Sequence, residues 1–249
     1  MAAWNSGKVV EHRQWSQTLY SLYVESDIEA FEAGQFVKIA LEINGEVIGR
    51  PYSLVNPPDC RPLEFYYIEV PNGPLTSHLI KLIPGDNILV APRAHGFMVL
   101  DEVPQAKQLW LMATGTGIGP FLSILMTDKP WQRYEQVVLV YAVRTLSELS
   151  YQERITQILT KHSGQFGFIP FLSREALDFA LPGRIPQAII DGRLEARAGI
   201  KISAENSQIM LCGNPQMVKD ITNILIERGL RKHRRFEPGQ ITSENYWQG

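Results

Sequence analysis

Two glycine-containing segments carry residue types suited to holding a phosphate group. Thr114–Pro120 reads Thr-Gly-Thr-Gly-Ile-Gly-Pro and Cys212–Pro215 reads Cys-Gly-Asn-Pro, each between an apolar run and a helical one. Glycine lets a backbone approach a pyrophosphate, and a helix N-terminus offers free N–H groups and a positive dipole end. The spacing is not the dinucleotide fingerprint G-x-G-x-x-G. Alone, each segment also fits a tight strand–helix turn, and a lone cysteine is typical of a core. Two such turns in one chain favour a nucleotide site.

Two arginines and a serine occupy comparable places. Ser173 and Arg174 end a predicted strand, and Arg184 precedes a predicted helix. Because a guanidinium pairs with a phosphate through two parallel hydrogen bonds, these side chains suit the 2′-phosphate of NADP. Glu175 is adjacent, and an acid at this place would instead hold the ribose hydroxyls of NAD. The residues alone leave the choice open.

A third segment, Arg50-Pro-Tyr-Ser53, interrupts a predicted strand. A flavin needs an aromatic face for its ring, a cation for its pyrophosphate and a hydroxyl near N5, and this segment offers all three. Pro51 also removes a backbone N–H donor. Taken alone, the four residues are more typical of an edge strand with a buried tyrosine.

Short strands separated by turns fill the first part of the chain. Their residues alternate or are β-branched and aromatic, as in half-buried strands. Asn44-Gly45 supplies the residues of a type I′ hairpin turn, and the predicted helix Thr76–Leu82 has Thr76 as a possible N-cap. Many short strands with one helix predict an antiparallel β-barrel. The predicted strands are Leu19–Val24, Phe36–Ile43, Leu63–Val70 and Asn87–Ala91.

The pattern changes after Asp101–Lys107, which we interpret as a linker. Apolar strands then alternate with helices, which predicts an α/β doubly wound parallel sheet that binds ligands at the carboxyl ends of its strands. We therefore expect two domains, at residues 1–101 and 102–249. The predicted strands are Leu109–Ala113, Val137–Val143, Phe166–Leu172 and Gln208–Cys212, and the predicted helices are Phe121–Thr127, Ser147–His162, Ile185–Arg197 and Pro215–Arg228.

The composition narrows the function classes. The 249 residues carry a net charge of −2, so no global field favours nucleic acid or an anionic membrane. Two cysteines, Cys60 and Cys212, exclude a disulfide framework and a four-cysteine iron–sulfur or zinc site within the chain. The uncharged stretch Leu109–Met126 is interrupted by glycines and Pro120, so we expect no membrane span. The N-terminus lacks an apolar signal core, and we expect a cytoplasmic protein.

The order and intervals of these segments resemble the ferredoxin–NADP reductase family, and within it the bacterial ferredoxin/flavodoxin–NADP reductases. The likeness extends from Trp4 to Trp247. It implies an antiparallel barrel domain that holds FAD, followed by an α/β domain that holds NADPH and whose C-terminal tail returns to the flavin. The segments that carry it are Arg50–Ser53, Gly115–Pro120, Ser173–Arg174, Gly183–Pro186, Cys212–Met217 and Tyr246–Trp247.

The resemblance also assigns the FAD contacts. It implies that Tyr52 covers one face of the isoalloxazine, that Ser53 hydrogen-bonds near N5 and that Arg50 binds the pyrophosphate. Tyr246 and Trp247 would shield the other face and stack on the adenine. The remaining expected FAD contacts are Pro51, Tyr66, Ile68, Pro74, Leu75, Thr76 and, between flavin and nicotinamide, Thr116.

The same resemblance assigns the NADP contacts and the residues that support catalysis. Ser53 and Cys212 are expected to support hydride transfer without acid–base catalysis, and no metal ion is expected. In this chain Gln248-Gly249 follow Trp247, whereas the plastid branch ends in a tyrosine. The expected NADP contacts are Val143, Arg144, Ser173, Arg174, Arg184, Asn214, Pro215, Gln216 and Asp220.

The resemblance implies electron transfer between NADPH and ferredoxin or flavodoxin, by a monomer. The basic run Leu230–Phe236 is either a solvated helix end or a docking site for an acidic carrier. Alternatives are an NAD(P)H-dependent reductase component that supplies an oxygenase, a free-flavin reductase and a non-catalytic flavin-binding subunit. Oxygenase reductases commonly carry a [2Fe–2S] domain, which the cysteine count excludes here, although a separate ferredoxin could take its place.

Overall fold

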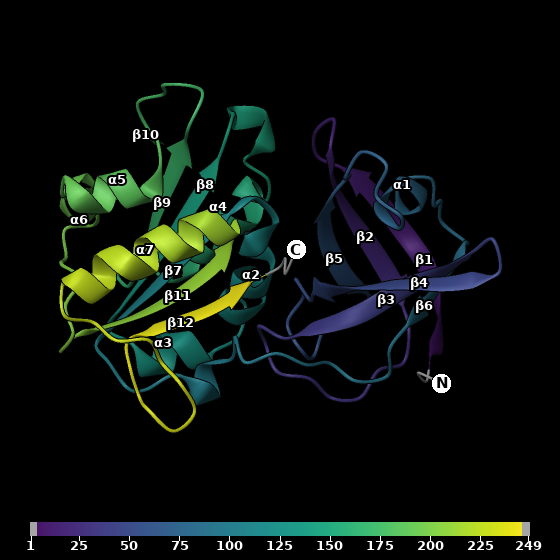
Figure 1. The fold of residues 1–249 in the computed structure, drawn as a ribbon, viewed down its shortest axis with the longest axis horizontal. Coiled ribbons are helices and arrows are strands. Elements are labelled where there is room, and N and C mark those ends of the chain that lie inside the picture. Colours follow the sequence, from purple (N-terminus) through teal and green to yellow (C-terminus); the bar gives the residue numbers. More distant parts are fainter. Residues whose placement is uncertain (1–3, 246–249) are drawn as a thin grey trace.

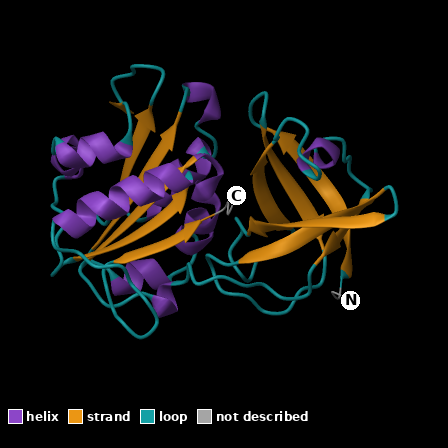
Figure 2. Ribbon diagram, in the orientation of Figure 1, coloured by secondary structure: helices purple, strands orange, loops and turns teal. Residues whose placement is uncertain are grey.

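The computed structural model describes residues 4–245, which form two halves side by side (Figure 1). The antiparallel half contains the six-stranded sheet β1–β6, and the parallel half contains the six-stranded sheet β7–β12. Figure 2 shows that helices gather around the parallel sheet, whereas the antiparallel sheet carries the short helix α1. This arrangement confirms the predicted combination of an antiparallel barrel with a doubly wound α/β sheet.

The antiparallel sheet has the strand order β4-β3-β6-β1-β2-β5 and closes into a barrel. Just beyond β4, Leu54 forms a bridge with Phe65 of β5, so the two edge strands meet. This bridge joins the two edges at one end, while the rest of β4 keeps one side without ladder hydrogen bonds. The strands are β1 (Asn5–Gln14), β2 (Leu19–Glu25), β3 (Phe36–Ile43), β4 (Glu46–Ser53), β5 (Leu63–Ile68) and β6 (Asn87–Val90).

The hairpin between β3 and β4 confirms the predicted turn. Asn44 and Gly45 both have positive φ, 53° and 81°, as a type I′ turn requires, and Ile43 pairs with Glu46 across it. The prediction that Arg50–Ser53 interrupts a strand was wrong, since β4 runs through it. Pro51 is tolerated because an edge strand has one side without ladder hydrogen bonds.

The helix predicted at Thr76–Leu82 is a single turn, α1 (Thr76–Leu79). Thr76 is not its N-cap; Leu75 holds that position without a side-chain cap. The Thr76 hydroxyl instead accepts a hydrogen bond from Val70 N (3.1 Å) and donates to Val70 O (3.3 Å). It therefore closes the preceding turn rather than the helix.

The parallel sheet has the order β10-β9-β8-β7-β11-β12. Every described pair in it runs parallel, so the carboxyl ends of the strands lie at one edge. The strands are β7 (Gln108–Thr114), β8 (Gln136–Val143), β9 (Phe166–Leu172), β10 (Leu181–Pro182), β11 (Ser207–Gly213) and β12 (Ile241–Asn245). The helices are α2 (Gly119–Leu125), α3 (Lys129–Arg133), α4 (Gln152–Lys161), α5 (Ile185–Ile190), α6 (Arg193–Ala198) and α7 (Pro215–Glu227), with 3-10 turns at Leu100–Glu102, Gly115–Ile118 and Leu146–Glu148. Among the helices of residues 4–245, none has the length and apolar character needed to cross a bilayer.

Alternation along β7 divides the core of the parallel half into two layers. Leu109 and Leu111 pack with α2 and α4, whereas Trp110 and Met112 pack with α5 and α7. Helices therefore cover both faces, which explains why β7 and β8 read as continuous apolar runs. The first layer also includes Tyr66 of the antiparallel half, so apolar packing continues across the boundary between the halves.

Several element boundaries differ from the prediction, each for a local backbone reason. The helix expected from Ser147 begins only at Gln152, because Tyr151 has φ 63°. The helix expected over Ile185–Arg197 is split into α5 and α6 at Gly192, which has φ 79°. Strand β12 was not predicted; it pairs with β11, and Figure 1 shows it pointing toward the antiparallel half.

Gly34 provides a test of the packing between the barrel and the connection that follows it. A Cβ on Gly34, at φ +103°, would lie 1.9 Å from Met98 O. Gly34→Ala should lower the free energy of unfolding by more than about 4 kcal/mol, because both backbone strain and a clash with a carbonyl oppose it. The control Gly85→Ala has similar strain, φ +100°, but open space, and should cost about 1–2 kcal/mol. Urea denaturation measures both, and equal losses would show that Met98 moves aside at no cost.

Candidate functional site

Two cavities adjoin where the halves meet. The strand-end cavity, about 520 Å³, lies at the carboxyl ends of β7, β8, β9 and β11. The barrel cavity, about 510 Å³, is lined by β4, β5 and the segment leading into α1. Ile68 and Thr116 line both. Each volume is in the range of a cofactor pocket, and ligands in the two cavities would meet at this shared wall.

The glycines of the two turns have different structural roles: one leaves room for a ligand, and two allow the turns to pack together. Gly115, at φ +52°, faces open space and lines the strand-end cavity, so its missing side chain leaves room for a ligand. A Cβ on Gly117 would lie 2.5 Å from Cys212 O, and one on Gly213 would lie 2.6 Å from Thr114 O. Those two glycines are required because the turns after β7 and β11 pack directly against each other.

The turn after β11 forms the N-terminus of α7. Asn214 Oδ1 accepts hydrogen bonds from Gln216 N (2.9 Å) and Met217 N (3.2 Å), and is thus the N-cap. Asn214 N donates to Thr114 Oγ1 at 2.7 Å. Gln216 Nε2 donates to Asp220 Oδ1 at 2.7 Å. All four residues predicted here line the strand-end cavity: Asn214, Pro215, Gln216 and Asp220.

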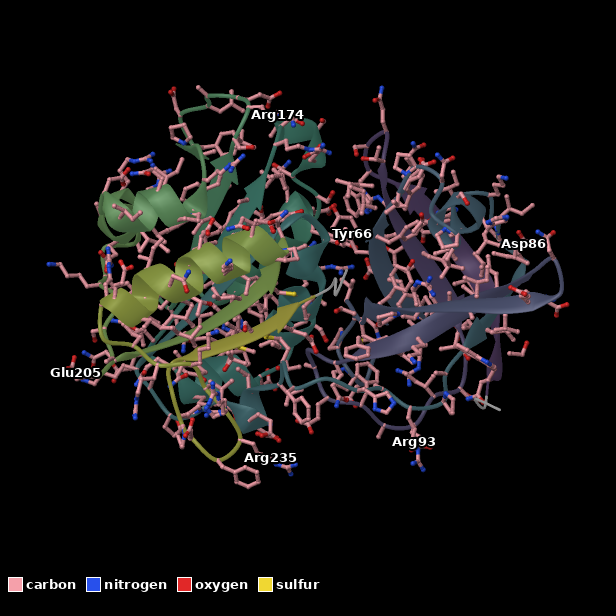
Figure 3. All side chains as sticks on the ribbon, viewed as in Figure 1. Tyr66, Asp86, Arg93, Arg174, Glu205 and Arg235 are labelled. Carbon is pink, nitrogen blue, oxygen red and sulfur yellow. The ribbon has the colours of Figure 1, made fainter. Side chains whose placement is uncertain are left out.

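The structure separates the two predicted arginines. Ser173 and Arg184 line the strand-end cavity, whereas Arg174 is not among its lining residues. Figure 3 shows Arg174 on the loop that follows β9, at one end of the parallel half. Glu175 Oε2 accepts a hydrogen bond from Leu146 N at 2.6 Å, away from the cavity lining. That acid therefore ties two loops together and does not face the cavity.

Arg144 and Val143 also line the strand-end cavity, and Arg144 is held by an acid that the prediction missed. Glu148 Oε2 accepts from Arg144 N (3.0 Å) and Nε (3.1 Å), and its other oxygen pairs with Nη2. The hydrogen bond to Glu148 raises the pKa of Arg144. The i, i+4 spacing was visible in the sequence, but both residues lie beyond the end of β8, in a turn and the 3-10 turn Leu146–Glu148, so the spacing gave no helical signal.

The barrel cavity brings together the predicted flavin residues. Arg50, Pro51, Tyr52 and Ser53 line it, and Arg50 Nη1 donates to the carbonyl of Gly49 at 2.8 Å. Burial raises the pKa of Tyr52 to about 12, with Arg50 acting in the opposite direction. Tyr52 is therefore a neutral aromatic surface at any working pH. Gly119 of α2 lies close to Ser53, so the glycine turn that follows β7 contacts the barrel.

Two further tyrosines line the barrel cavity, and the prediction named one of them. Tyr66 and Tyr67 both line it, and only Tyr66 was predicted. Tyr67 packs edge-on against Tyr52, with ring centroids 6.2 Å apart. His12 fixes Tyr67: Nδ1 donates to Leu82 O (2.8 Å), so Nε2 accepts from the Tyr67 hydroxyl (2.8 Å). Tyr66 was expected from the resemblance, and because consecutive strand residues normally face opposite sides, the sequence pattern gave no sign that Tyr67 lines the same cavity.

Pro74, Leu75 and Thr76, which were predicted as FAD contacts, also line the barrel cavity. Gly73 also lines it, and a Cβ there would lie 2.6 Å from Thr76 Oγ1. The preceding Asn72 has φ 58°. The Pro-Asn-Gly-Pro sequence was the available signal for a tight turn, and Gly73 and Pro74 of that turn line the cavity.

Three further predicted residues are Cys212 and, in the C-terminal tail, Tyr246 and Trp247. Cys212 is fully buried and lines neither cavity. In the register of β11 and β12 it lies opposite Glu244, which the prediction missed. Tyr246 and Trp247, the two expected flavin contacts, lie outside the described residues.

Comparison with known proteins agrees with this geometry. Residues 111–223 match the model of the oxidoreductase NAD-binding domain. The chain is 46% identical over 248 residues to the flavodoxin/ferredoxin–NADP reductase of Escherichia coli (strain K12), covering 99% of this chain and 100% of that protein. This chain belongs to the flavodoxin/ferredoxin–NADP reductase family. The resemblance inferred from the sequence motifs is confirmed.

Other members of the flavodoxin/ferredoxin–NADP reductase family are similar over the same length. A ferredoxin–NADP reductase of Pseudomonas aeruginosa is 36% identical and covers 95% of each chain. The crystal structure of a ferredoxin NADP+ reductase from Neisseria gonorrhoeae, with bound FAD and NADP, has a TM-score of 0.94 at 32% identity and covers 99% of this chain and 100% of that one. A cytochrome P450 reductase from Amycolatopsis is less similar, with a TM-score of 0.79 at 26% identity over 70% of its chain.

The residues present fit the two cofactors of this reductase family. The barrel cavity offers flat tyrosine rings and a guanidinium beside backbone groups of a tight turn, which match a flavin ring and a pyrophosphate. The strand-end cavity offers an open glycine turn, a hydroxyl and two guanidiniums, which match a phosphorylated nucleotide.

The burial of Glu244 predicts that the stability of this reductase depends on pH. Its Oε2 is buried with no hydrogen-bond partner among the described residues, and burial raises its pKa from 4.5 to about 7. Folding thus favours the protonated form. The stabilisation is complete below the unfolded pKa and is lost as pH rises through about 7, at most about 3 kcal/mol.

Glu244→Gln should therefore raise the free energy of unfolding at pH 8 and leave it nearly unchanged at pH 5. Denaturant titration at both pH values measures the effect. The control Glu205→Gln, at an exposed position that Figure 3 labels, should have no such pH dependence. A gain of the same size at both pH values would show that the carboxylate is not destabilised by burial.

Proposed function

We propose that the chain binds FAD in the barrel cavity and NADP(H) in the strand-end cavity, and transfers electrons between NADPH and ferredoxin or flavodoxin. The observation that carries this assignment is the wall that the two cavities share. Because Ile68 and Thr116 line both, a nicotinamide in one cavity can reach a flavin in the other. Hydride transfer needs this proximity and alignment.

The FAD assignment follows the chemistry of the barrel cavity. Tyr52 provides a half-buried aromatic face for the ring, Ser53 provides a hydroxyl beside it and Arg50 provides a cation for the pyrophosphate. Pro51, Tyr66, Ile68 and Thr116 complete the pocket around the ring. Pro74, Leu75 and Thr76 would approach the phosphates with their backbone. Tyr246 and Trp247 remain proposed contacts on the other face and the adenine.

The NADP assignment uses the strand-end cavity. Gly115 leaves space for the pyrophosphate, and Ser173 and Arg184 suit the 2′-phosphate. Arg144 lies in the same lining, and its contact with Glu148 is one that a phosphate could replace. We propose that Arg174, which lies farther away, attracts the 2′-phosphate by its charge. The remaining proposed contacts are Val143, Asn214, Pro215, Gln216 and Asp220.

When bound, FAD supplies the redox chemistry, accepting two electrons as hydride and releasing them singly. The residues of the chain bind and orient the two cofactors and exclude water from between them. Thr116 and Ile68 set the contact between the rings, and Ser53 provides a hydrogen-bonding hydroxyl. Cys212 is fully buried in the core cluster that includes α2 and β7, and we propose that it supports hydride transfer indirectly, by packing at the end of β11.

We also propose a division into domains after residue 101, a monomer, and a location in the cytoplasm. The net charge of −2 argues against nucleic acid as a partner. The boundary is supported by the change of sheet type between β6 and β7.

A visible spectrum of the purified protein, before and after anaerobic NADPH and NADH, tests the proposed function. Bound flavin should bleach rapidly with NADPH and reduce a ferredoxin or flavodoxin afterwards. Heat release should yield FAD, and recovery of FMN alone would contradict the cofactor assignment. Flavin that exchanges freely in each turnover would indicate a free-flavin reductase.

Nucleotide preference should depend on Arg184. Because a charged hydrogen bond contributes about 1.5–3 kcal/mol, Arg184→Ala should weaken the binding of NADPH about 10–150-fold. The binding of NADH should be nearly unchanged. Arg174→Ala should have a smaller effect of the same kind. Steady-state KM and kcat with both nucleotides measure it. Arg193→Ala is the control, since Arg193 pairs with Asp191 at 2.9 Å and lies outside the cavity lining. Equal losses with NADPH and NADH would remove Arg184 from 2′-phosphate recognition.

Carrier docking should depend on the basic loop after α7. Arg231, Lys232, Arg234 and Arg235 are exposed there, and Figure 3 shows Arg235 at the far end of the loop. Neutralising all four should raise KM for an acidic ferredoxin and flatten its salt dependence, because charges beyond a Debye length of about 8 Å are screened at physiological strength. Reduction of a small neutral acceptor should be unaffected. An unchanged KM and salt dependence would mean that the loop is a solvated helix end.

A further inference from the structure

The two halves meet at a buried carboxylate. Glu64, on β5, is 2% exposed and accepts hydrogen bonds from both halves. Within the antiparallel half, the Tyr23 hydroxyl lies 2.9 Å from its Oε1. From the parallel half, the Tyr151 hydroxyl lies 2.8 Å from the same oxygen and Arg154 Nη1 lies 2.9 Å from Oε2. We call Glu64, Tyr151 and Arg154 the Glu64 cluster.

A chain of donors ends on this carboxylate. Trp15 Nε1 donates to Ser21 Oγ at 2.8 Å, and Ser21 Oγ lies 2.6 Å from the Tyr151 hydroxyl. Since Tyr151 donates to Glu64, Ser21 donates to Tyr151. Burial, reinforced by the charge of Glu64, raises the pKa of Tyr151 well above its ordinary value. Such a chain is polarised toward the negative charge, and each bond strengthens the next.

The backbone at Tyr151 is held in an uncommon conformation. Its φ of 63° lies in the left-handed region, which bulky residues avoid unless their surroundings fix them. This turn lets two consecutive residues reach β5. The Tyr66 hydroxyl donates to Ser150 Oγ at 2.9 Å, while Tyr151 bonds Glu64, and the Tyr66 and Tyr151 rings lie edge to face at 5.0 Å.

The strand held in this way is the one that forms the shared wall. Every second residue of a strand faces the same side, so Glu64, Tyr66 and Ile68 project to one side of β5. Tyr66 lines the barrel cavity and Ile68 lines both cavities. Figure 3 shows Tyr66 at the side of the antiparallel half that faces the parallel half. No member of the Glu64 cluster lines either cavity.

We propose that Glu64, Tyr151 and Arg154 are positioning residues for hydride transfer: they hold β5 against the parallel half and so fix how the nicotinamide meets the flavin. This inference rests on the proposed function. The cluster binds neither cofactor, so its loss should change alignment and leave binding intact.

Tyr151→Phe in the FAD-loaded enzyme tests the inference, because it removes one hydroxyl and keeps the ring. The matched control is Tyr23→Phe, which removes a hydrogen bond to the same Glu64 oxygen but within one half. Tyr151→Phe should slow single-turnover flavin reduction by NADPH about tenfold or more, since small misplacements cost that much. It should also diminish the change in the flavin absorption spectrum on adding NADP+, with the Kd for NADP+ and the retention of FAD unchanged. Tyr23→Phe should match the unmodified enzyme in all four measurements.

Arg154 provides a second pair of variants should Tyr151→Phe fail to fold. Its side chain is 28% exposed and keeps its charge in the Lys variant, so Arg154→Lys is the milder change, and thermal denaturation checks that both variants are folded. Arg154→Gln should reproduce the slow hydride transfer and the smaller spectral change, and Arg154→Lys, which keeps the charge, should restore them in part. If both Tyr151→Phe and Arg154→Gln transfer hydride as Tyr23→Phe does, the cluster only stabilises the fold. If the unmodified chain neither retains FAD nor is reduced by NADPH, the proposed function fails, and this inference with it.

Discussion

The close approach of two glycine turns is the constraint on which the rest of the site depends. The turns after β7 and β11 touch so tightly that neither Gly117 nor Gly213 could carry a Cβ without a shift of the backbone. The contact is reinforced where Asn214 N donates to Thr114 Oγ1. Because the turns lie on neighbouring strands, this packing fixes the middle of the carboxyl edge of the sheet. Thr116 is thereby placed at the wall between the two cavities, and the N-terminus of α7 opens beside it.

The second constraint is the boundary between the halves, which is both apolar and polar. Leu19, Val55 and Tyr66 belong to the same buried cluster as α2 and β7. Hydrogen bonds cross the same boundary, including Ser123 Oγ to Asn56 O at 2.8 Å. Apolar contact is insensitive to direction, whereas hydrogen bonds are directional. The combination explains how two sheets of different type can hold one site at a fixed geometry.

The sequence was informative wherever a local rule decides the outcome. Continuous apolar runs predicted β7, β8, β9 and β11 because helices cover both faces of those strands. Asn44-Gly45 predicted a hairpin because few residues tolerate positive φ at both positions. The outcome was less predictable where tertiary contacts decide. Tyr151 interrupts the helix predicted from Ser147 and delays its start to Gln152, in a conformation that tyrosine alone would not choose. Strand β12 exists because an unpaired edge of β11 accepts it. The motif around Ser173 likewise gave no sign that Arg184 would line the cavity and Arg174 would not.

The small overlap between the two cavities has a consequence for how such a chain can diverge. Of the residues that line either cavity, Ile68 and Thr116 line both. Ser173, Arg184 and Arg144 stand on loops of the parallel half that do not touch the barrel cavity. Mutations there can alter which nucleotide is accepted without disturbing the flavin pocket, and changes around Tyr52 and Tyr67 can alter the flavin environment without disturbing the nucleotide. Selection can therefore act on the choice of electron donor and on the redox properties of the cofactor as nearly independent traits.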